Sequence, residues 1–211
     1  MITVIGNMKG GSGKSTVAFN LAVWRAMQNR TVKLVDLDTQ RTLSDLVAIR
    51  TEEGFVPELG LLPADSNLSQ LRKDSADIIV DVGASNFDRM LEAIRHADSI
   101  LIPVVPGQAD VWSTQRYLKI VQGERRPECS VMLFLNRTDA LGGSKETREA
   151  AVALNVLMNM LEGVTVLPGR LGQRVSFCRS LSEGLAVFEL DPRSKATQEF
   201  FDLANAIEAT R

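Results

Sequence analysis

A glycine-rich run lies between a short apolar segment and an amphipathic one, and it limits the folds that this chain can adopt. The run is MKGGSGKST, residues 8–16. It follows the apolar segment Ile2–Ile5, and residues 16–28 after it repeat apolar side chains at helical spacing. A strand, a glycine-rich loop and a helix in this order can bind phosphate. Glycines let backbone N–H groups turn toward an anion, and the helix N-terminus adds its dipole. The chain is therefore predicted to hold a phosphate group here.

The residue types of the run match what a nucleoside triphosphate and Mg²⁺ require. Lys14 can reach the terminal phosphates, and the Ser15 hydroxyl can bind Mg²⁺. The usual pattern G-x-x-x-x-G-K-[ST] fails at its first position, because Met8 stands where glycine is expected, and a second lysine, Lys9, follows it. The predicted nucleotide-binding residues of the run are Lys9, Gly10, Gly11, Ser12, Gly13, Lys14, Ser15 and Thr16.

Composition sets limits on the class of protein. A chain of 211 residues predicts a single domain, 1–211, with a sizeable core. The net charge of −2, from 24 basic and 26 acidic residues, gives no general sign of nucleic-acid binding, so any DNA contact would need a local patch. No apolar run approaches the roughly 20 residues of a membrane-spanning helix, and Ile2–Ile5 is too short for a signal peptide. A cytoplasmic protein is expected.

Neither the cysteines nor the histidine suggests a catalytic role. Cys129 and Cys178 lie in apolar surroundings without metal-ligand spacing, and both are predicted to be buried free thiols. His96 is expected at the surface or at a helix end.

Strand-like apolar runs alternate with helix-like periodic runs along the whole chain. This alternation predicts an α/β fold with a mostly parallel β-sheet and helices on both faces. Strands are expected at 2–5, 31–35, 60–62, 77–82, 99–105, 131–135 and 164–167, and helices at 16–28, 43–49, 68–73, 87–96, 111–121, 144–161, 175–181 and 194–209.

Aspartates follow two of the predicted strands, at the edge where ligands bind in parallel sheets. Asp81 ends the apolar run Ile78–Val80 and is predicted to hold Mg²⁺ through water, although a strand-end aspartate can also cap the next turn. Asp36 and Asp38 are alternate residues, which predicts that both face the phosphates.

Together these motifs resemble the deviant Walker A loop and its partners in the ParA/MinD family of P-loop ATPases. Asp36 to Gln40 resembles the family segment D-x-D-P-Q, with Thr39 in place of proline. The residues 103–106 and 184–189 resemble further family segments, so the likeness spans nearly the whole chain. It is strongest to short plasmid-type ParA partition proteins without an N-terminal DNA-binding domain.

The resemblance implies a SIMIBI-type P-loop fold and roles for named residues. Lys9, Lys14 and Asp38 would be catalytic, with Asp38 placing the hydrolytic water, and Asp36 would support the loop and the metal shell. Asn136, at the end of a predicted strand, would contact the base. Lys9 would cross into a partner subunit's site, whereas the alternative for Lys9 is a solvated loop lysine.

The implied activity is slow, Mg²⁺-dependent ATP hydrolysis by a homodimer that forms on ATP binding. A ParB-like or other partner protein would stimulate hydrolysis, and the dimer would position a cargo such as a plasmid, a chromosome region or a protein assembly while bound to non-specific DNA of the nucleoid. Two alternatives stay open. One is a MinD-like membrane-associated ATPase, and the other is a P-loop enzyme that phosphorylates or amidates a small molecule.

Two surface features bear on these alternatives. The C-terminal segment Glu199–Arg211 carries few cations, so it is predicted to pack on the core and not on a membrane. Arg170, Arg174 and Arg179 lie in a stretch without acidic residues and are the DNA-binding candidates. The alternative for these arginines is ion pairing or a place in the dimer seam.

Overall fold

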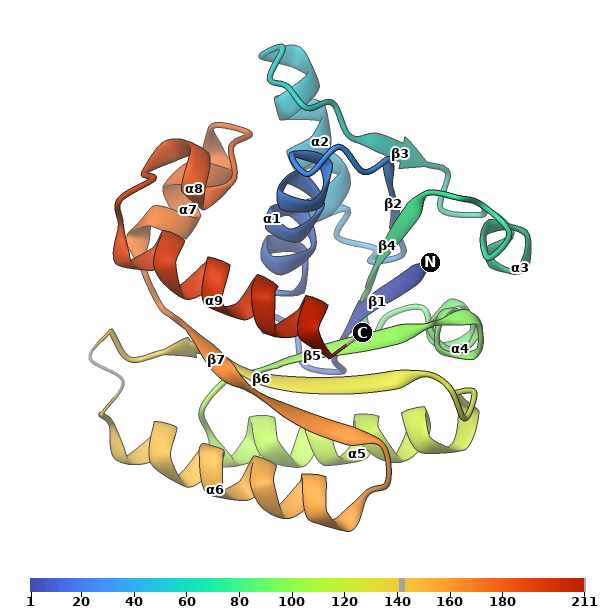
Figure 1. Ribbon diagram of the computed structural model, residues 1–211. Helices are drawn as coiled ribbons and strands as arrows, with labels where there is room; N and C mark the ends of the chain where they lie inside the picture. Colours follow the sequence, from blue (N-terminus) through green and yellow to red (C-terminus); the bar gives the residue numbers. More distant parts are fainter. Residues whose placement is uncertain (141–142, 211) are drawn as a thin grey trace.

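The computed structural model describes residues 1–140 and 143–210, and within them the chain forms one parallel β-sheet covered by helices on both faces (Figure 1). The strand order in the sheet is β3-β2-β4-β1-β5-β6-β7, and every pairing is parallel. The strands are β1 (Ile2–Gly6), β2 (Val32–Asp36), β3 (Gly60–Leu62), β4 (Asp77–Val82), β5 (Ser99–Val104), β6 (Ser130–Thr138) and β7 (Val164–Gly172). The predicted α/β fold class is confirmed.

The helices divide into two layers, and each layer buries a hydrophobic core against one face of the sheet. The first core takes side chains from α3, α4, α5 and α6. The second takes side chains from α1, α2, α7, α8 and α9. The helices are α1 (Lys14–Ala26), α2 (Thr42–Glu52), α3 (Leu68–Leu71), α4 (Phe87–His96), α5 (Gln108–Glu124), α6 (Lys145–Met160), α7 (Val175–Ser182), α8 (Val187–Leu190) and α9 (Lys195–Ala209).

The centre of the sheet positions the residues that the sequence singled out. Strands β4, β1 and β5 are almost wholly buried and rich in β-branched residues, as expected for parallel strands covered on both faces. In the register of the sheet, Asp81 lies beside Ile5 on one side and beside Asp36 on the other. The glycine-rich loop, the Asp36 segment and Asp81 therefore meet at one edge of the sheet.

Most predicted elements are confirmed, with shifted ends, and two segments differ. The strand expected to end at Leu167 continues through Pro168 to Gly172 as β7. Proline is tolerated here because β7 is an edge strand and its pairing with β6 is irregular between Val166 and Arg170. The short helix α8 was not predicted, since four residues give no helical period.

The cysteine prediction is half right. Cys129 is buried, but Cys178 is exposed on α7. A short helix in apolar sequence buries only one side, and Phe177 occupies the buried side next to it. His96 is the last residue of α4, as expected for a helix-end residue.

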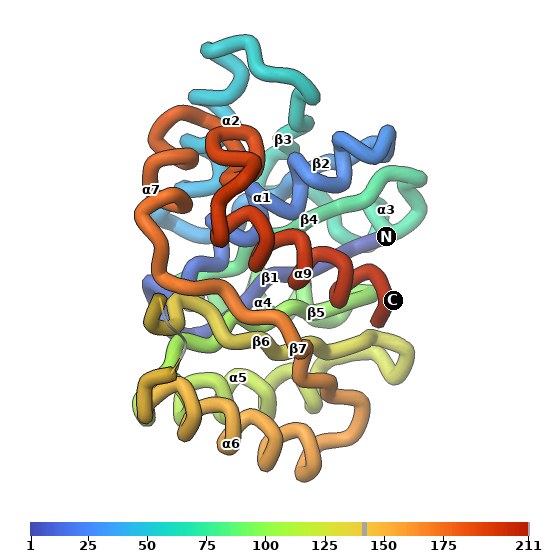
Figure 2. Tube along the Cα trace, turned by 60° about the vertical axis from the view of Figure 1, so that its left-hand side comes forward, coloured from blue at the N-terminus to red at the C-terminus, as the bar shows by residue number. Residues whose placement is uncertain are grey.

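The C-terminal helix α9 packs on the core, as predicted. Its apolar row of Phe200, Leu203 and Ile207 is buried, and Figure 2 shows α9 running beside β7. Within residues 1–140 and 143–210, no helix combines the length and the apolar character needed to cross a membrane.

Two fully buried arginines form hydrogen bonds between helices of the second layer. Arg50 of α2 donates to both carboxylate oxygens of Glu189 in α8, each at 2.9 Å, and to the carbonyl of Gly184. Arg25 of α1 donates to Glu208 of α9. The segment 184–189, which the sequence singled out by resemblance, thus has a structural role in this chain.

Candidate functional site

The glycine-rich loop leads directly into α1, whose first residue is Lys14. Gly11 and Gly13 have φ angles of 73° and 88°, in the left-handed region that favours glycine. A Cβ atom on Gly13 would also lie 2.4 Å from Nδ2 of Asn136. Both glycines are therefore required by the shape of the loop.

The two lysines of the loop have different surroundings. Lys14 is only 6% exposed, and its Nζ lies 4.0 Å from Oδ2 of Asp38. Lys9 is exposed and has no carboxylate partner among residues 1–140 and 143–210. Lys14 is thus directed into the site, whereas the side chain of Lys9 is exposed to solvent.

Two side chains at the end of β6 donate hydrogen bonds to carbonyl groups of the glycine-rich loop. Asn136 donates from Nδ2 to the Ser12 carbonyl at 2.7 Å, and Arg137 donates from Nη1 to the Gly11 carbonyl at 2.6 Å. When consecutive carbonyls are held on one side, the N–H groups of the loop are free to face an anion on the other. Asn136 therefore supports the loop in this structure, and its predicted contact with a base stays a prediction.

Arg137 and Asn7 also contact the loop, although no sequence motif predicted a role for either. Arg137 follows Asn136 and has a φ of 54°, unusual for a residue other than glycine. Asn7 is buried; it donates to the Pro103 carbonyl and accepts from the Lys9 N–H, so it fixes the first turn of the loop. A polar residue directly between a buried strand and a glycine-rich loop is a signal that could have identified Asn7.

Asp81 is a fully buried carboxylate, and among the described residues neither of its oxygens has a hydrogen-bond partner. Burial raises the pKa of Asp81 to about 7; the neighbouring Ser15 hydroxyl and the Lys14 ammonium act against this rise, while Asp36 and Asp38 add to it. Buried acceptors without partners need an explanation, and a cation with its waters would satisfy them. Asp81 and Ser15 therefore fit a Mg²⁺ site.

Asp36 anchors the loop after β2. Its Oδ1 accepts from the Asp38 N–H, and its Oδ2 accepts from both the N–H and the hydroxyl of Ser44 in the first turn of α2. Both oxygens are thus engaged within the protein. Asp36 therefore supports the loop that carries Asp38, and its predicted part in the metal shell stays a prediction.

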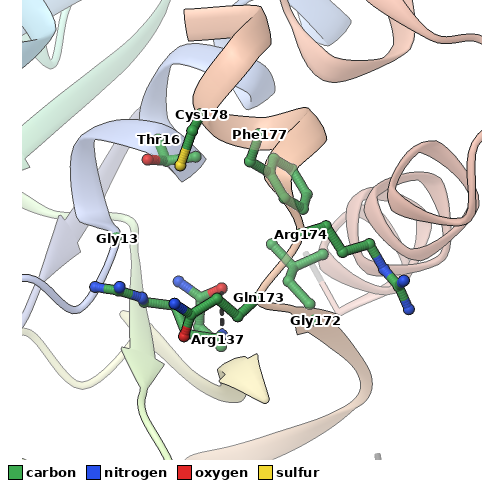
Figure 3. A pocket seen from close by; sticks show the side chains of 10 residues that line it. Gly13, Thr16, Arg137, Gly172, Gln173, Arg174, Phe177 and Cys178 are labelled. Carbon is green, nitrogen blue, oxygen red and sulfur yellow. Dashed lines mark hydrogen bonds between the residues drawn. The ribbon is translucent and has the colours of Figure 1, made fainter. Parts of the chain in front are cut away.

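A pocket of about 200 Å³ opens beside the loop, between α1, the end of β6 and the segment from β7 to α7 (Figure 3). It has an apolar wall from Leu171 and Phe177 and polar groups from Thr16 and Gln173. An apolar wall with a few convergent polar groups is typical of small-molecule sites. Its lining residues are Gly13, Thr16, Asn136, Arg137, Leu171, Gly172, Gln173, Arg174, Phe177 and Cys178.

The three candidate DNA-binding arginines do not form one acid-free surface. Arg174 donates to both carboxylate oxygens of Glu199, at 2.8 and 2.7 Å, and this pairing raises the pKa of Arg174. Arg170 shares a hollow with Glu199 and Asp202. The alternative of ion pairing is therefore correct for Arg174, because α9 brings acidic residues that are distant in the sequence. Arg179 is exposed on α7.

Comparisons with known proteins agree with this geometry. The family model described as CobQ/CobB/MinD/ParA nucleotide binding domain matches residues 3–187. The chain is 28% identical over 211 residues to maintenance of carboxysome distribution protein A of Halothiobacillus neapolitanus, covering 96% of this chain and 94% of that protein. It is 31% identical over 130 residues to Protein ParA of Rhizobium radiobacter, covering 58% of this chain and 57% of that protein.

Solved structures share the fold. The ATP complex of a variant of Cyanothece McdA has a TM-score of 0.77 at 20% identity, over 99% of this chain and 96% of that one. The Mg-ADP complex of the septum site-determining protein MinD of Pyrococcus horikoshii has a TM-score of 0.75 at 19% identity, over 98% and 95%. The architecture described above is thus the P-loop fold of MinD and ParA.

Proposed function

Because this chain belongs to the family of the CobQ/CobB/MinD/ParA nucleotide-binding domain, we propose that it is a Mg²⁺-dependent ATPase that works as a positioning switch. Its dimer would form on ATP binding, and slow hydrolysis would release it. The observation that carries the proposal is the meeting of a buried lysine, Lys14, with two carboxylates, Asp38 and Asp81, around one glycine-rich loop.

The proposed reaction is hydrolysis of the terminal phosphoanhydride bond. A water oxygen attacks the γ-phosphorus, and the bond from that phosphorus to the β–γ bridging oxygen breaks, giving ADP and phosphate. Lys14 is placed to neutralise charge on the phosphates. Asp38, within ion-pair distance of Lys14, is placed to accept a hydrogen bond from the attacking water and orient it.

Ser15 and Asp81 are the residues that would hold Mg²⁺, the Ser15 hydroxyl directly and Asp81 through water. Bound there, the ion would neutralise charge on the β- and γ-phosphates. The pocket lined by Leu171 and Phe177 lies where a base and ribose would continue from phosphates in the loop. This placement supports a nucleotide as the ligand, and we propose ATP because of the family.

The surface around Lys9 supports a second copy as the partner. Phe87 begins α4 and is 49% exposed, and Trp112 in α5 is 54% exposed. Both helices follow the strands that flank β1, so these apolar side chains belong to the same edge of the sheet as the loop. A second copy on this edge would cover them and would bring Lys9 to the opposite nucleotide.

The test of the dimer is its mass in solution with ATP, ADP or no nucleotide. We expect a dimer with Mg-ATP and a monomer without nucleotide, and we expect Lys9→Ala to abolish both the dimer and ATP hydrolysis while ATP binding persists. Lys119→Ala, at an exposed position on the later part of α5, is the matched control. An unchanged ATP-dependent dimer in Lys9→Ala would exclude the role of Lys9 in trans.

Non-specific DNA is the surface on which we propose that the dimer acts. Two of the candidate arginines, Arg170 and Arg179, are exposed. If they contact phosphates, Arg170→Glu with Arg179→Glu should weaken salt-sensitive DNA binding, whereas Lys73→Glu, an exposed control, should not. DNA binding that survives the double change would place the contact elsewhere. A ParB-like partner would be recognised by faster ATP turnover when it is added.

A further inference from the structure

Gly83, two residues after Asp81, lies against the Asp38 carboxylate. A Cβ atom added to Gly83 would lie 2.4 Å from Oδ2, 2.5 Å from Cγ and 2.8 Å from Oδ1 of Asp38. These are the three nearest heavy atoms around that position, and all belong to one carboxylate. Gly83 is buried, so the space that its missing side chain leaves is filled by Asp38.

The backbone of Gly83 does not itself require glycine. Its φ lies outside the left-handed region, unlike that of Gly11 or Gly13. The steric demand thus comes from the close approach of Asp38. The methyl group of an alanine at position 83 would contact the Asp38 carboxylate, and none of its three nearest atoms would be a backbone atom. The carboxylate can therefore move aside while the fold persists.

The Asp38 carboxylate has contacts on several sides, and Gly83 lies against one of them. Oδ1 accepts from the Gln40 N–H at 3.0 Å, and Oδ2 faces Lys14 Nζ at 4.0 Å. The two loops are also joined directly, because the Thr39 hydroxyl donates to the Ser85 hydroxyl at 2.9 Å. The loop after β4 therefore contacts the same carboxylate that faces Lys14.

We propose that Gly83 is a positioning residue that sets the place of the Asp38 carboxylate and thereby the rate of the chemical step. The inference rests on the proposed function, in which Asp38 orients the attacking water. A carboxylate that orients water loses most of its effect when it moves by about 1 Å, and displacements of that size can cost on the order of 100-fold in rate. Nucleotide affinity depends mainly on the glycine-rich loop and Lys14, which Gly83 does not touch among its nearest contacts.

The experiment is a double-mutant cycle on Gly83→Ala and Asp38→Ala. Single-turnover hydrolysis of Mg-ATP by the full chain and the dissociation constant of ATP are measured for each protein, and thermal unfolding verifies folding. We expect Gly83→Ala to slow hydrolysis by about 10-fold or more, with ATP affinity within about threefold of the unchanged protein. Gly123→Ala is the control, since a Cβ at exposed Gly123 meets nothing within 4 Å.

The cycle separates positioning from a general structural effect. With Asp38→Ala already present, the carboxylate that collides with the new methyl group is gone, so Gly83→Ala should slow hydrolysis no further. An equal loss of rate in both backgrounds would overturn the inference, and so would unchanged hydrolysis in Gly83→Ala. If the unchanged chain neither binds nor hydrolyses ATP, the proposed function itself fails, which is a distinct result.

Discussion

The buried carboxylate of Asp81 makes the free protein sensitive to pH in a predictable direction. Its pKa is about 7 in the folded chain, against an ordinary value of 3.8, because burial opposes ionisation. Below pH 3.8 the Asp81 carboxyl is protonated in both the folded and the unfolded chain, so it does not lower the free energy of unfolding. As the pH rises, the unfolded chain releases its proton first, and stability from this group is lost progressively until the pH passes the folded pKa.

The size of this loss follows from the two pKa values. At about 1.4 kcal/mol per pH unit, the difference between 3.8 and about 7 corresponds to about 4 kcal/mol. Roughly 3 kcal/mol of it falls between pH 5 and pH 8. For a chain of this length, that is a change on the order of 5–10 °C in melting temperature.

The perturbation that isolates this effect is Asp81→Asn, which cannot ionise. We expect the melting temperature of Asp81→Asn minus that of the unchanged chain to increase from pH 5 to pH 8, measured without nucleotide and Mg²⁺. Asp65→Asn, at an exposed aspartate, should show no such trend. A difference that is constant with pH, or that falls toward pH 8, would refute the claim that ionised Asp81 is costly without a cation.

The remaining predictions test the packing and the pocket. Glu189→Ala should destabilise the chain by about 3–5 kcal/mol, because it leaves Arg50 buried without its carboxylate; Glu128→Ala, at an exposed glutamate, should change the free energy of unfolding by less than about 1 kcal/mol in denaturant titrations. A thiol reagent should modify Cys178 in the native chain, and Mg-ATP should slow that reaction, while Cys129 stays unreactive because it is buried and its pKa is raised to about 11. Equal losses in the two glutamate variants, or labelling of Cys178 that ignores ATP, would contradict these expectations.

The parts of the site that depend on local sequence could be predicted. Strand, loop and helix around Lys14 are consecutive in the chain, and the strand ends at Asp36 and Asp81 follow from apolar runs that stop at a carboxylate. In a parallel sheet such ends share one edge, so the meeting of these groups did not require knowledge of the strand order.

The parts that depend on distant contacts could not be predicted in this way. Arg137 reaches the Gly11 carbonyl across 126 positions in the sequence, and Arg174 is paired with Glu199 by the packing of α9 on β7. No period or motif marks either contact. The contact of Gly83 with Asp38 is of the same kind, since it arises where two loops approach each other.

The nucleotide site is tested by the affinity for Mg-ATP of the unchanged chain and of Lys14→Ala, measured by calorimetry with and without EDTA. We expect that the unchanged chain binds ATP, that EDTA weakens this binding, and that Lys14→Ala loses most of it while remaining folded. A chain that does not bind Mg-ATP, or a Lys14→Ala variant that binds it equally well, would show that the loop around Lys14 is not a nucleotide site.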